Sequence, residues 1–308
     1  MPTRQERIEG GLIGLLVGDA LGVPYEFYSP EEIPSLLEIE FEPPPGFDRT
    51  YMKIPPGTWS DDGAQALCLL ASLLDYGRVD PEDLAHRFLD WYKNGYMAVD
   101  GNVFGVGTHT ARVLLAIQDG MPALEAAMLG KQAKGNGSLM RSLPLVLWHR
   151  GTDAELVEDA HLQSRTTHGQ LTCQVCCALY CLWARRVLEE VENPWQSAVS
   201  TLRQLYPENS PYHLELERSI CPNDPPEGKG SGYVVDCLHS ARLAVQAGNY
   251  EQVVKAAIAL GNDTDTTACV AGGIAGLRDG IHAIPERWRS QLRGQELFQP
   301  LLKRLLQL

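Results

Sequence analysis

The sequence is short of basic side chains. Its 308 residues include 26 Lys and Arg against 39 Asp and Glu, which gives a formal net charge of -13 at pH 7. Surfaces that bind nucleic acid or anionic membranes need clustered Lys and Arg to displace counterions from the phosphates. The composition therefore argues against both partners. An anionic ligand would need a local device, such as a bound metal, a helix N-terminus or a group of backbone amides.

Targeting segments and a disulfide framework are also missing. The N-terminus has no basic and apolar leader, and we see no apolar run of about 18 residues, so we expect neither a signal peptide nor a membrane span. The cytoplasm is the default location. The eight cysteines are too few for a disulfide scaffold in a chain of this length. Four of them recur at helical spacing, which favours a buried helix face over a zinc site: Cys173, Cys176, Cys177 and Cys181.

Alternating stretches typical of β-strands are nearly absent, and apolar residues recur instead at helical spacing in segments closed by glycine. The segments expected to be helical are 64–77, 81–95, 108–120, 122–135, 232–248 and 250–261. With 44% hydrophobic residues, the chain can fill a sizeable core. We expect an all-α fold, a compact multi-helix bundle that forms a single domain over residues 1–308. The proline-rich segments 40–63 and 206–232 are expected to be irregular, and long loops of this kind tend to be functional.

Acidic and hydroxyl side chains gather at three expected helix boundaries. They stand in GLLVGDALGVPYEF (14–27), GTWSDDGAQAL (57–67) and LGNDTDTTACVAGG (260–273). Each cluster alone is explained by an acidic N-cap that the helix dipole stabilises. Asp61 and Asp62, however, are adjacent and point about 100° apart on a helix, so they cannot share one capping hydrogen bond. They can reach two different cations.

Together the clusters are typical of a site for hard divalent cations. Mg²⁺ prefers oxygen ligands from carboxylates, hydroxyls and water, and paired ions about 3.5 to 4 Å apart activate a hydrolytic water. We expect Asp263 and Asp265 to project the same way from an extended turn, while Asp19 in the first cluster caps or braces its own turn. DTDTTA is not an EF-hand loop, because position six would be Ala268 and position twelve Ile274.

Two glycine-rich stretches need scrutiny as phosphate-binding loops. EGKGSG (227–232) has the wrong spacing of Gly and Lys, and no Ser or Thr follows Lys229, so we discount it. KGNGSLMRSLPL (134–145) is a Gly-Asn-Gly turn that runs into an apolar helix. Such a turn offers free N–H groups to an anion, although a simple link between helices has the same composition.

Taken in order, these motifs resemble those of the ADP-ribosylglycohydrolase family, which includes the dinitrogenase reductase activating glycohydrolase and the ADP-ribosyl-acceptor hydrolases. The stretches that carry the resemblance span about Gly11 to Gly280: GLLVGDALGVPYEF, GTWSDDGAQAL, GNGSLMRSLPL, SRTTHGQ, GSGYVVDCLHSA and ALGNDTDTTACVAGGIAGL. The resemblance implies an all-α fold of that family's type. It also implies a centre of two Mg²⁺ or Mn²⁺ ions at the base of an ADP-ribose cleft.

The resemblance assigns roles to residues position by position. The implied metal ligands are Ser60, Asp61, Asp62, Asp263, Asp265 and Thr266. The implied ADP-ribose-binding residues are Gly135, Asn136, Gly137, Ser138 and His168. The implied catalytic residues are Glu26, to which we assign the acid/base role, and Asp62. Of the implied ligands, Ser60, Asp61 and Asp62 form the first metal motif of the resemblance, and Asp263, Asp265 and Thr266 form the second metal motif. Small residues behind the second metal motif would let helices pack closely: Ala268, Gly272 and Gly273.

The implied activity is hydrolysis at C1 of a ribose, which removes ADP-ribose from a modified protein or a small molecule. Two cations would chelate the cis-diol of that ribose and supply an activated water, while a carboxylate transfers the proton. Arginine is the first expected acceptor, with serine or a free small ADP-ribosyl compound close behind. One departure bears on this choice: members that cleave arginine linkages often have Asp-Ile-Gly where this sequence has Gly105 in VFGVGTHTARVL. A dimetal phosphohydrolase and a non-catalytic ADP-ribose-binding protein remain alternatives.

Overall fold

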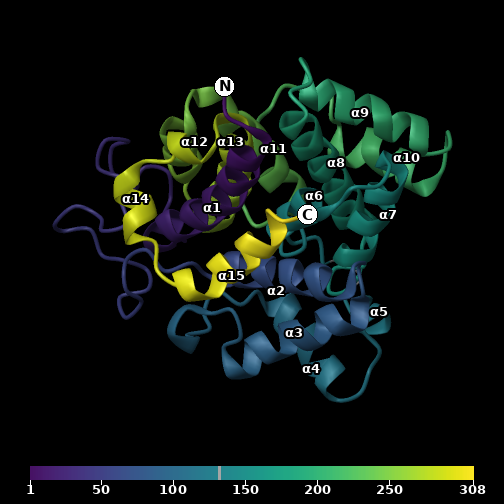
Figure 1. Cartoon of the computed structure of the whole chain (residues 1–308), viewed down its shortest axis with the longest axis horizontal. Helices are drawn as coiled ribbons and strands as arrows, with labels where there is room; N and C mark the ends of the chain where they lie inside the picture. The colour runs from purple at the N-terminus through teal and green to yellow at the C-terminus, as the bar shows by residue number, and fades with distance from the viewer. Residues whose placement is uncertain (131–132) are drawn as a thin grey trace.

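Helices form the regular structure of this protein, as the sequence predicts (Figure 1). The computed structural model describes residues 1–130 and 133–308, and within them it has no β-strand and one isolated bridge, between Gly135 and Tyr233. The α-helices are α1 (Arg4–Gly22), α2 (Asp61–Tyr76), α3 (Pro81–Asn94), α4 (Thr108–Gln118), α5 (Ala123–Ala126), α6 (Leu143–Trp148), α7 (Asp153–Ser164), α8 (Leu171–Leu188), α9 (Pro194–Leu205), α10 (Pro211–Glu215), α11 (Val234–Ala244), α12 (Tyr250–Ile258), α13 (Thr264–Asp279), α14 (Glu286–Gln291) and α15 (Gln295–Leu305).

Local signals in the sequence set many helix ends. Thr3 and Glu6 form a capping box at the start of α1, and the Ser60 hydroxyl caps α2. Helices α2 and α3 end at Gly77 and Gly95, whose φ angles of 66° and 75° suit glycine better than any other residue. The expected helices therefore match α2, α3, α4, α11 and α12 to within a few residues.

Helices α1 and α13 lie side by side at the centre of the fold and pack backbone against backbone (Figure 1). A Cβ atom added at Gly18 would lie 2.2 Å from the carbonyl oxygen of Ala268, and one at Gly14 would lie 2.6 Å from that of Gly272. Gly273 makes similar room for α6. The expectation that small residues allow close packing behind the second metal motif is therefore confirmed. This contact brings the last turn of α1 beside the first turn of α13.

The helix expected over residues 122–135 is wrong in its described part, because α5 ends at Ala126. The carbonyl oxygen of Ala127 accepts a hydrogen bond from the amide of Gly169 at 3.2 Å. That bond to a distant segment takes the place of helical hydrogen bonds, and local periodicity gives no sign of it. Residues 131–132 of the expected helix lie outside the described residues.

The two segments expected to be irregular differ in their structure. Residues 40–60 form turns and loops up to the start of α2, as expected. The segment 206–232 is partly helical, because it contains α10 and a π-helical turn over Leu216–Ile220. Ser210 caps α10 through its hydroxyl, and the two end residues of the π-helical turn are buried in the core. The prediction that this whole segment is irregular is therefore wrong.

Two long helices have unusually apolar sequences. The stretch Arg4–Tyr25 and helix α8 are long and apolar enough to cross a membrane by length and composition, which corrects the expectation that no such run exists. Their apolar windows are 94% and 89% buried inside the fold, so the core position of both helices accounts for their composition. The four cysteines of α8 are free and buried, as expected of a core helix face: Cys173, Cys176, Cys177 and Cys181.

Candidate functional site

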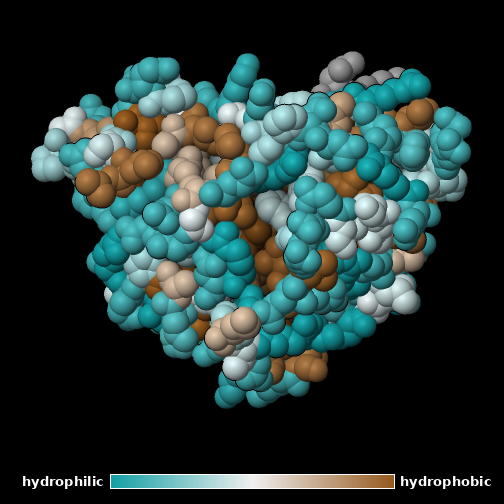
Figure 2. Space-filling view, turned by 90° about the horizontal axis from the view of Figure 1, so that it is seen from above, coloured by the Kyte–Doolittle hydropathy of each residue, from teal (hydrophilic) through white to brown (hydrophobic). Residues whose placement is uncertain are grey.

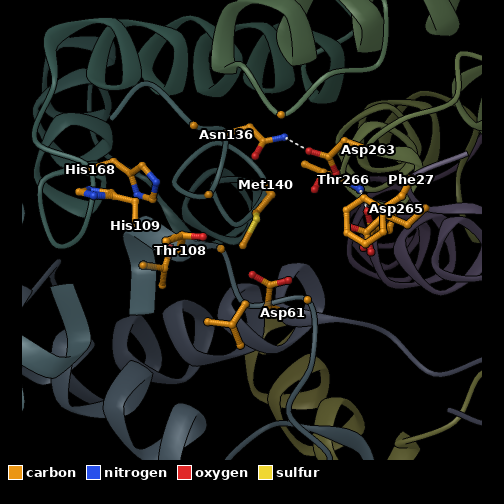
Figure 3. A pocket seen from close by; sticks show the side chains of 18 residues that line it. Phe27, Asp61, Thr108, His109, Asn136, Met140, His168, Asp263, Asp265 and Thr266 are labelled. Carbon is orange, nitrogen blue, oxygen red and sulfur yellow. Dashed lines mark hydrogen bonds between the residues drawn. The ribbon is translucent and has the colours of Figure 1, made fainter. Parts of the chain in front are cut away.

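The three acidic clusters meet at one cleft with a volume of about 400 Å³ (Figure 3). Asp61 comes from the first turn of α2, Asp263 and Asp265 come from the start of α13, and Glu26 follows the short turn after α1. The lining also includes Phe27, Gly105, Thr108, His109, Gly135, Asn136, Gly137, Met140, His168 and Thr266. Segments far apart in the sequence thus supply carboxylates to a single space.

The second metal motif differs in conformation from the expectation. Asp265 is not in an extended turn, because α13 already includes it and Asp263 is the N-cap residue. The carboxylates nevertheless converge. Ligand oxygens of Glu26, Asp263 and Asp265 lie within 4.8 Å of one another, and so do those of Asp19, Asp62 and Asp265. Asp265 belongs to both groups, so the two sets are adjacent.

Hydrogen bonds distinguish capping residues from free carboxylates in this cluster. Ser60 is the N-cap of α2, and its hydroxyl accepts a hydrogen bond from the Asp62 amide at 3.3 Å. The Asp263 side chain makes no capping hydrogen bond although it stands at an N-cap. Its Oδ2 instead accepts from Nδ2 of Asn136 at 2.9 Å, as Figure 3 shows. The Asp263 side chain therefore does not cap α13.

Two carboxylate oxygens are buried without a hydrogen-bond partner among the described residues, namely Asp62 Oδ1 and Glu26 Oε2. The other oxygen of Asp62 accepts from the hydroxyls of Ser60 at 2.9 Å and Thr266 at 3.4 Å. A buried polar atom without a partner is costly, and a bound cation removes that cost. Carboxylates and hydroxyls are also the donors that Mg²⁺ and Mn²⁺ favour. The residues present therefore fit a hard divalent metal.

Burial changes the acidity of these carboxyl groups. It raises the pKa of Asp19 to about 7 and that of Glu26 to about 8. Burial, followed by repulsion from neighbouring carboxylates, raises the pKa of Asp61, Asp62 and Asp265 well above the usual range. A cation among these groups would stabilise their ionised forms, because opposite charges at short range lower carboxyl pKa values.

Asp19 has a different partner from the one expected. It does not cap its own turn. It is fully buried inside α1, and its carboxylate accepts hydrogen bonds from the amides of Ser60 at 2.9 Å and Gly63 at 2.7 Å. Asp19 therefore holds the first turn of α2, where the first metal motif stands.

The Gly-Asn-Gly turn is built partly as expected. The amides of Gly137 and Ser138 donate to no acceptor within the described part of the chain, while the Asn136 amide donates to the Gly232 carbonyl at 3.1 Å. A further turn separates these residues from α6, so the apolar helix starts later than expected. The Ser138 side chain is fully buried and accepts from the Ser164 hydroxyl at 2.9 Å. Ser138 therefore lies behind the cleft lining, whereas Gly135, Asn136 and Gly137 line the cleft itself.

Two histidines line the side of the cleft away from the carboxylates (Figure 3). The rings of His109 and His168 are 4.9 Å apart and meet edge to face. His109 Nε2 lies 2.9 Å from the carbonyl oxygen of Thr167, which can only accept, so this nitrogen carries the hydrogen. Burial lowers the pKa of both histidines, which keeps them neutral at pH 7. The sequence indicated His168 through its motif, but nothing local marks His109.

Arg141, which the sequence did not single out, connects the parts of the site. Its buried guanidinium donates to Gln65 Oε1 at 2.9 Å, to the Gly137 carbonyl at 3.2 Å and to the Thr167 hydroxyl at 2.8 Å. Gln65 in turn donates to Asp61 Oδ2 at 3.3 Å. One side chain thus ties the first metal motif to the Gly-Asn-Gly turn and to the histidines.

The discounted stretch 227–232 uses its amides internally. The amides of Lys229 and Ser231 donate to the carboxylate of Asp236 at 3.0 and 2.7 Å. A carboxylate of the protein itself thus occupies donors that a phosphate would need, as the spacing of Gly and Lys in this loop also indicates.

Known proteins resemble this chain along nearly its whole length. The family model described as ADP-ribosylglycohydrolase matches residues 1–308. The ADP-ribosylarginine hydrolase Tri1 of Pseudomonas putida (strain GB-1) is 26% identical, over 97% of this chain and 78% of that protein. The ADP-ribosyl-[dinitrogen reductase] glycohydrolase of Rhodospirillum rubrum is 27% identical, over 94% and 92%. The ADP-ribosylhydrolase ARH3 of Homo sapiens is 28% identical, over 94% and 90%. A solved structure of an ADP-ribosylglycohydrolase-related protein complex superposes with a TM-score of 0.79 at 30% identity, covering 100% of this chain and 99% of the other.

Proposed function

The chain belongs to the ADP-ribosylglycohydrolase family, and from this premise we propose that it is a metal-dependent hydrolase that removes ADP-ribose from modified protein side chains. Cleavage would occur at C1 of the ribose. The observation that carries the proposal is the pair of buried carboxylate oxygens without partners, Asp62 Oδ1 and Glu26 Oε2, within a cluster of oxygen donors at the cleft. Family membership supplies the reaction, and these oxygens support the need for cations.

The residues that would hold two Mg²⁺ or Mn²⁺ ions are Ser60, Asp61, Asp62, Asp263, Asp265 and Thr266. When bound, such a pair orients a cis-diol as a Lewis acid and lowers the pKa of a water molecule. Among the side chains that offer oxygen ligands, the carboxylates matter most because each supplies a negative charge. Asp62 would contribute to catalysis as one of these anionic metal ligands.

Glu26 is our candidate for proton transfer. Its carboxylate lines the cleft and lies within 4.8 Å of ligand oxygens of Asp263 and Asp265, so it would stand beside the C1 atom of a bound ribose. A group in this position can give a proton to the leaving group or take one from water. Burial favours its protonated form, whereas the Tyr51 hydroxyl favours its ionised form, so both states are within reach.

The other side of the cleft suits the diphosphate and the distal ribose. Gly137 lines the cleft, and its amide can donate to an anion without breaking a hydrogen bond within the described chain. The Thr167 hydroxyl accepts from Arg141 and lies 2.8 Å from His168 Nδ1, to which it can donate. Nε2 of His168 then carries the hydrogen and can donate to the ligand.

Arginine is the proposed acceptor, with serine second and a free small ADP-ribosyl compound as a further alternative. The relative named as an ADP-ribosylarginine hydrolase supports arginine, whereas the ARH3 relatives keep other linkages open. Gly105 weighs against an arginine acceptor. Its φ is 77°, and a Cβ added there would lie 2.4 Å from Asp61 Oδ1. An Asp at this position would therefore need a different backbone conformation.

We further propose a cytoplasmic protein that binds neither nucleic acid nor membranes, in view of its net charge of -13.

The deciding experiment is incubation with arginine-linked and serine-linked ADP-ribosyl peptides in Mg²⁺ or Mn²⁺, with the products identified by mass spectrometry. We expect free ADP-ribose and an unmodified peptide, and we expect EDTA to abolish their formation. Phosphate release without cleavage at C1 would favour a phosphohydrolase. Binding of ADP-ribose without turnover would favour a non-catalytic protein. A titration should also show that ADP-ribose binds more tightly than AMP, which lacks the proximal ribose.

A further inference from the structure

Phe27 is exposed at the edge of the cleft, on the side of the carboxylates. Its relative exposure is 71%, and it is labelled beside Asp265 in Figure 3, across the cleft from the two histidines. The loop between α1 and α2 has other exposed apolar residues, Leu36, Leu37 and Met52, but among these four Phe27 alone lines the cleft. Figure 2 shows a largely hydrophilic face with hydrophobic residues at the left, where this loop lies in Figure 1, and others near the middle.

The backbone of Phe27 is unusual for a bulky aromatic residue. Its φ is 71°, in the left-handed region that favours Gly and Asn. Asn262 is also left-handed, with φ of 61°, and two hydrogen bonds join the segments: Phe27 N donates to Asn262 O at 2.6 Å, and Asn262 N donates to Tyr28 O at 2.7 Å. Since Asn262 directly precedes Asp263, the strained backbone fixes the ring relative to a proposed metal ligand. Strain of this kind is retained where a residue has a function.

The ring of Phe27 has no aromatic partner among the described residues, although Tyr25 and Tyr28 both pair with Phe47. Its exposed face is therefore open to a ligand. On the proposed function, the diphosphate lies near Asn136 and the histidines, and C1 of the proximal ribose lies at the carboxylates. The group joined to C1 then leads away from the histidines and toward Phe27. The ring is placed to meet the acceptor and not the nucleotide.

The surroundings of Phe27 suit a planar cation. No Lys or Arg lines the cleft in the described part of the chain, whereas Glu26, Asp61, Asp263 and Asp265 do. A guanidinium stacks on an aromatic face through cation–π attraction and is less strongly hydrated than an ammonium. The protein uses the same contact inside its core, where the Arg141 guanidinium lies 4.5 Å from the centre of the Phe88 ring. A serine acceptor offers neither the charge nor the plane.

We propose that Phe27 is a specificity-determining residue whose ring receives the guanidinium group of an ADP-ribosylated arginine. This inference rests on the proposed function and names the substrate class of the same site. It assigns Phe27 to recognition of the acceptor, while ribose binding and proton transfer stay with the carboxylates. The part of the cleft that holds ADP-ribose is therefore independent of the ring.

Three variants test the proposal. Phe27→Asn removes the ring but keeps a residue that tolerates the left-handed backbone, and Phe27→Trp keeps an aromatic face. Leu37→Asn is the matched control, because Leu37 is 89% exposed on the same loop and does not line the cleft. For each variant, kcat and KM are measured on arginine-linked and serine-linked peptides with Mg²⁺, together with the Kd of ADP-ribose.

We expect Phe27→Asn to lower kcat/KM about tenfold on the arginine-linked peptide, mainly through KM, because a partly desolvated cation–π contact is lost. The serine-linked peptide and the Kd of ADP-ribose should change by less than about twofold, since neither uses the ring. Phe27→Trp and Leu37→Asn should behave like the original protein.

Two results would overturn the role of Phe27 and leave the glycohydrolase function standing. One is an equal loss, or no loss, on both peptides in Phe27→Asn. The other is an unaltered protein that cleaves the serine linkage but not the arginine linkage. If the unaltered protein releases ADP-ribose from neither peptide in either metal, the proposed function itself fails, and this inference fails with it.

Discussion

The amide of Ser60, just ahead of α2, donates hydrogen bonds to both carboxylate oxygens of Asp19 on α1, at 2.9 and 3.1 Å. The Gly63 amide adds a third bond at 2.7 Å. A negative charge at a helix N-terminus is favoured by the helix dipole, and here it comes from another helix. Asp19 thus sets the position of the turn from which Asp61 and Asp62 project.

Replacing Asp19 should weaken the fold with or without metal. In Asp19→Asn the amide nitrogen cannot accept, so either the Ser60 amide loses its shorter hydrogen bond or the Gly63 amide loses its bond to this side chain. We expect the free energy of unfolding to fall by about 1 to 3 kcal/mol. Urea denaturation in EDTA measures this. An unchanged unfolding midpoint would mean that Asp19 does not hold α2 in place.

The proposed ligands Asp62 and Asp265 should behave differently. Asp→Asn at either position keeps the size of the side chain but removes an anionic ligand, so we expect hydrolysis to fall by roughly a hundredfold or more. Without metal, the melting temperature should stay the same or rise, because a buried charge is lost. The double variant should lose little more activity than either single one, since both disable one unit. Near-normal turnover of an ADP-ribosyl peptide by Asp265→Asn would show that this carboxylate is not needed as a metal ligand.

The metal-free protein should lose stability as the pH rises. Burial raises the pKa of Asp19 to about 7 and that of Glu26 to about 8, from ordinary values of 3.8 and 4.5. Between the ordinary and raised values the folded protein binds more protons than the unfolded chain, so the free energy of unfolding falls with increasing pH. Mg²⁺ competes with these protons, so the stabilisation it gives should grow over the same range.

Melting curves at pH 5.5, 6.5 and 8, in EDTA and in Mg²⁺, test this linkage. In EDTA the melting temperature should be lowest at pH 8, and the difference between the two conditions should be largest there. A melting temperature in EDTA that rises steadily over this range would show that these carboxyl groups are not protonated in the folded state.

The contact between α1 and α13 should not tolerate even a methyl group at Gly18. Its Cβ would lie 2.2 Å from the backbone oxygen of Ala268, so Gly18→Ala must push the helices apart, and we expect a loss of about 1 to 3 kcal/mol. Gly11→Ala is the control on the same helix, because the atoms nearest to its Cβ would belong to side chains and not to backbone, those of Leu277 at 2.8 Å and Leu147 at 3.5 Å. Chemical denaturation of both variants compares the two positions. Equal losses of stability in the two variants would show that the backbone contact at Gly18 does not limit how closely α1 and α13 pack.

Local rules predicted much of the fold. The cap at the start of α2 and terminal glycines such as Gly77 act within a few residues, so the sequence around them is enough to place a helix end. The same holds for the acidic residues at the starts of α2 and α13. That these two starts meet in space follows from the resemblance, since no local rule relates residues so far apart in the chain.

The features of the site that the sequence missed depend on distant contacts. Asp19 bonds to Ser60 across a long loop, and Arg141 reaches α2 and Thr167 at once. His109 enters the cleft only because α4 lies against the segment that carries His168. The sequence around each of these side chains carries no motif that marks it, so its contacts become visible only in the folded structure.

The glycine contact between α1 and α13 also affects when this protein can become active. α1 leaves the ribosome long before α13, so the small-residue face of α1 stays without its partner until α13 has been made. Until residue 265 has emerged, Asp19 and Asp62 lack the third carboxylate of their group. A nascent chain, or a fragment that stops before α13, would therefore be inert even if its other helices had formed, and hydrolytic activity would report that the chain had been made through α13.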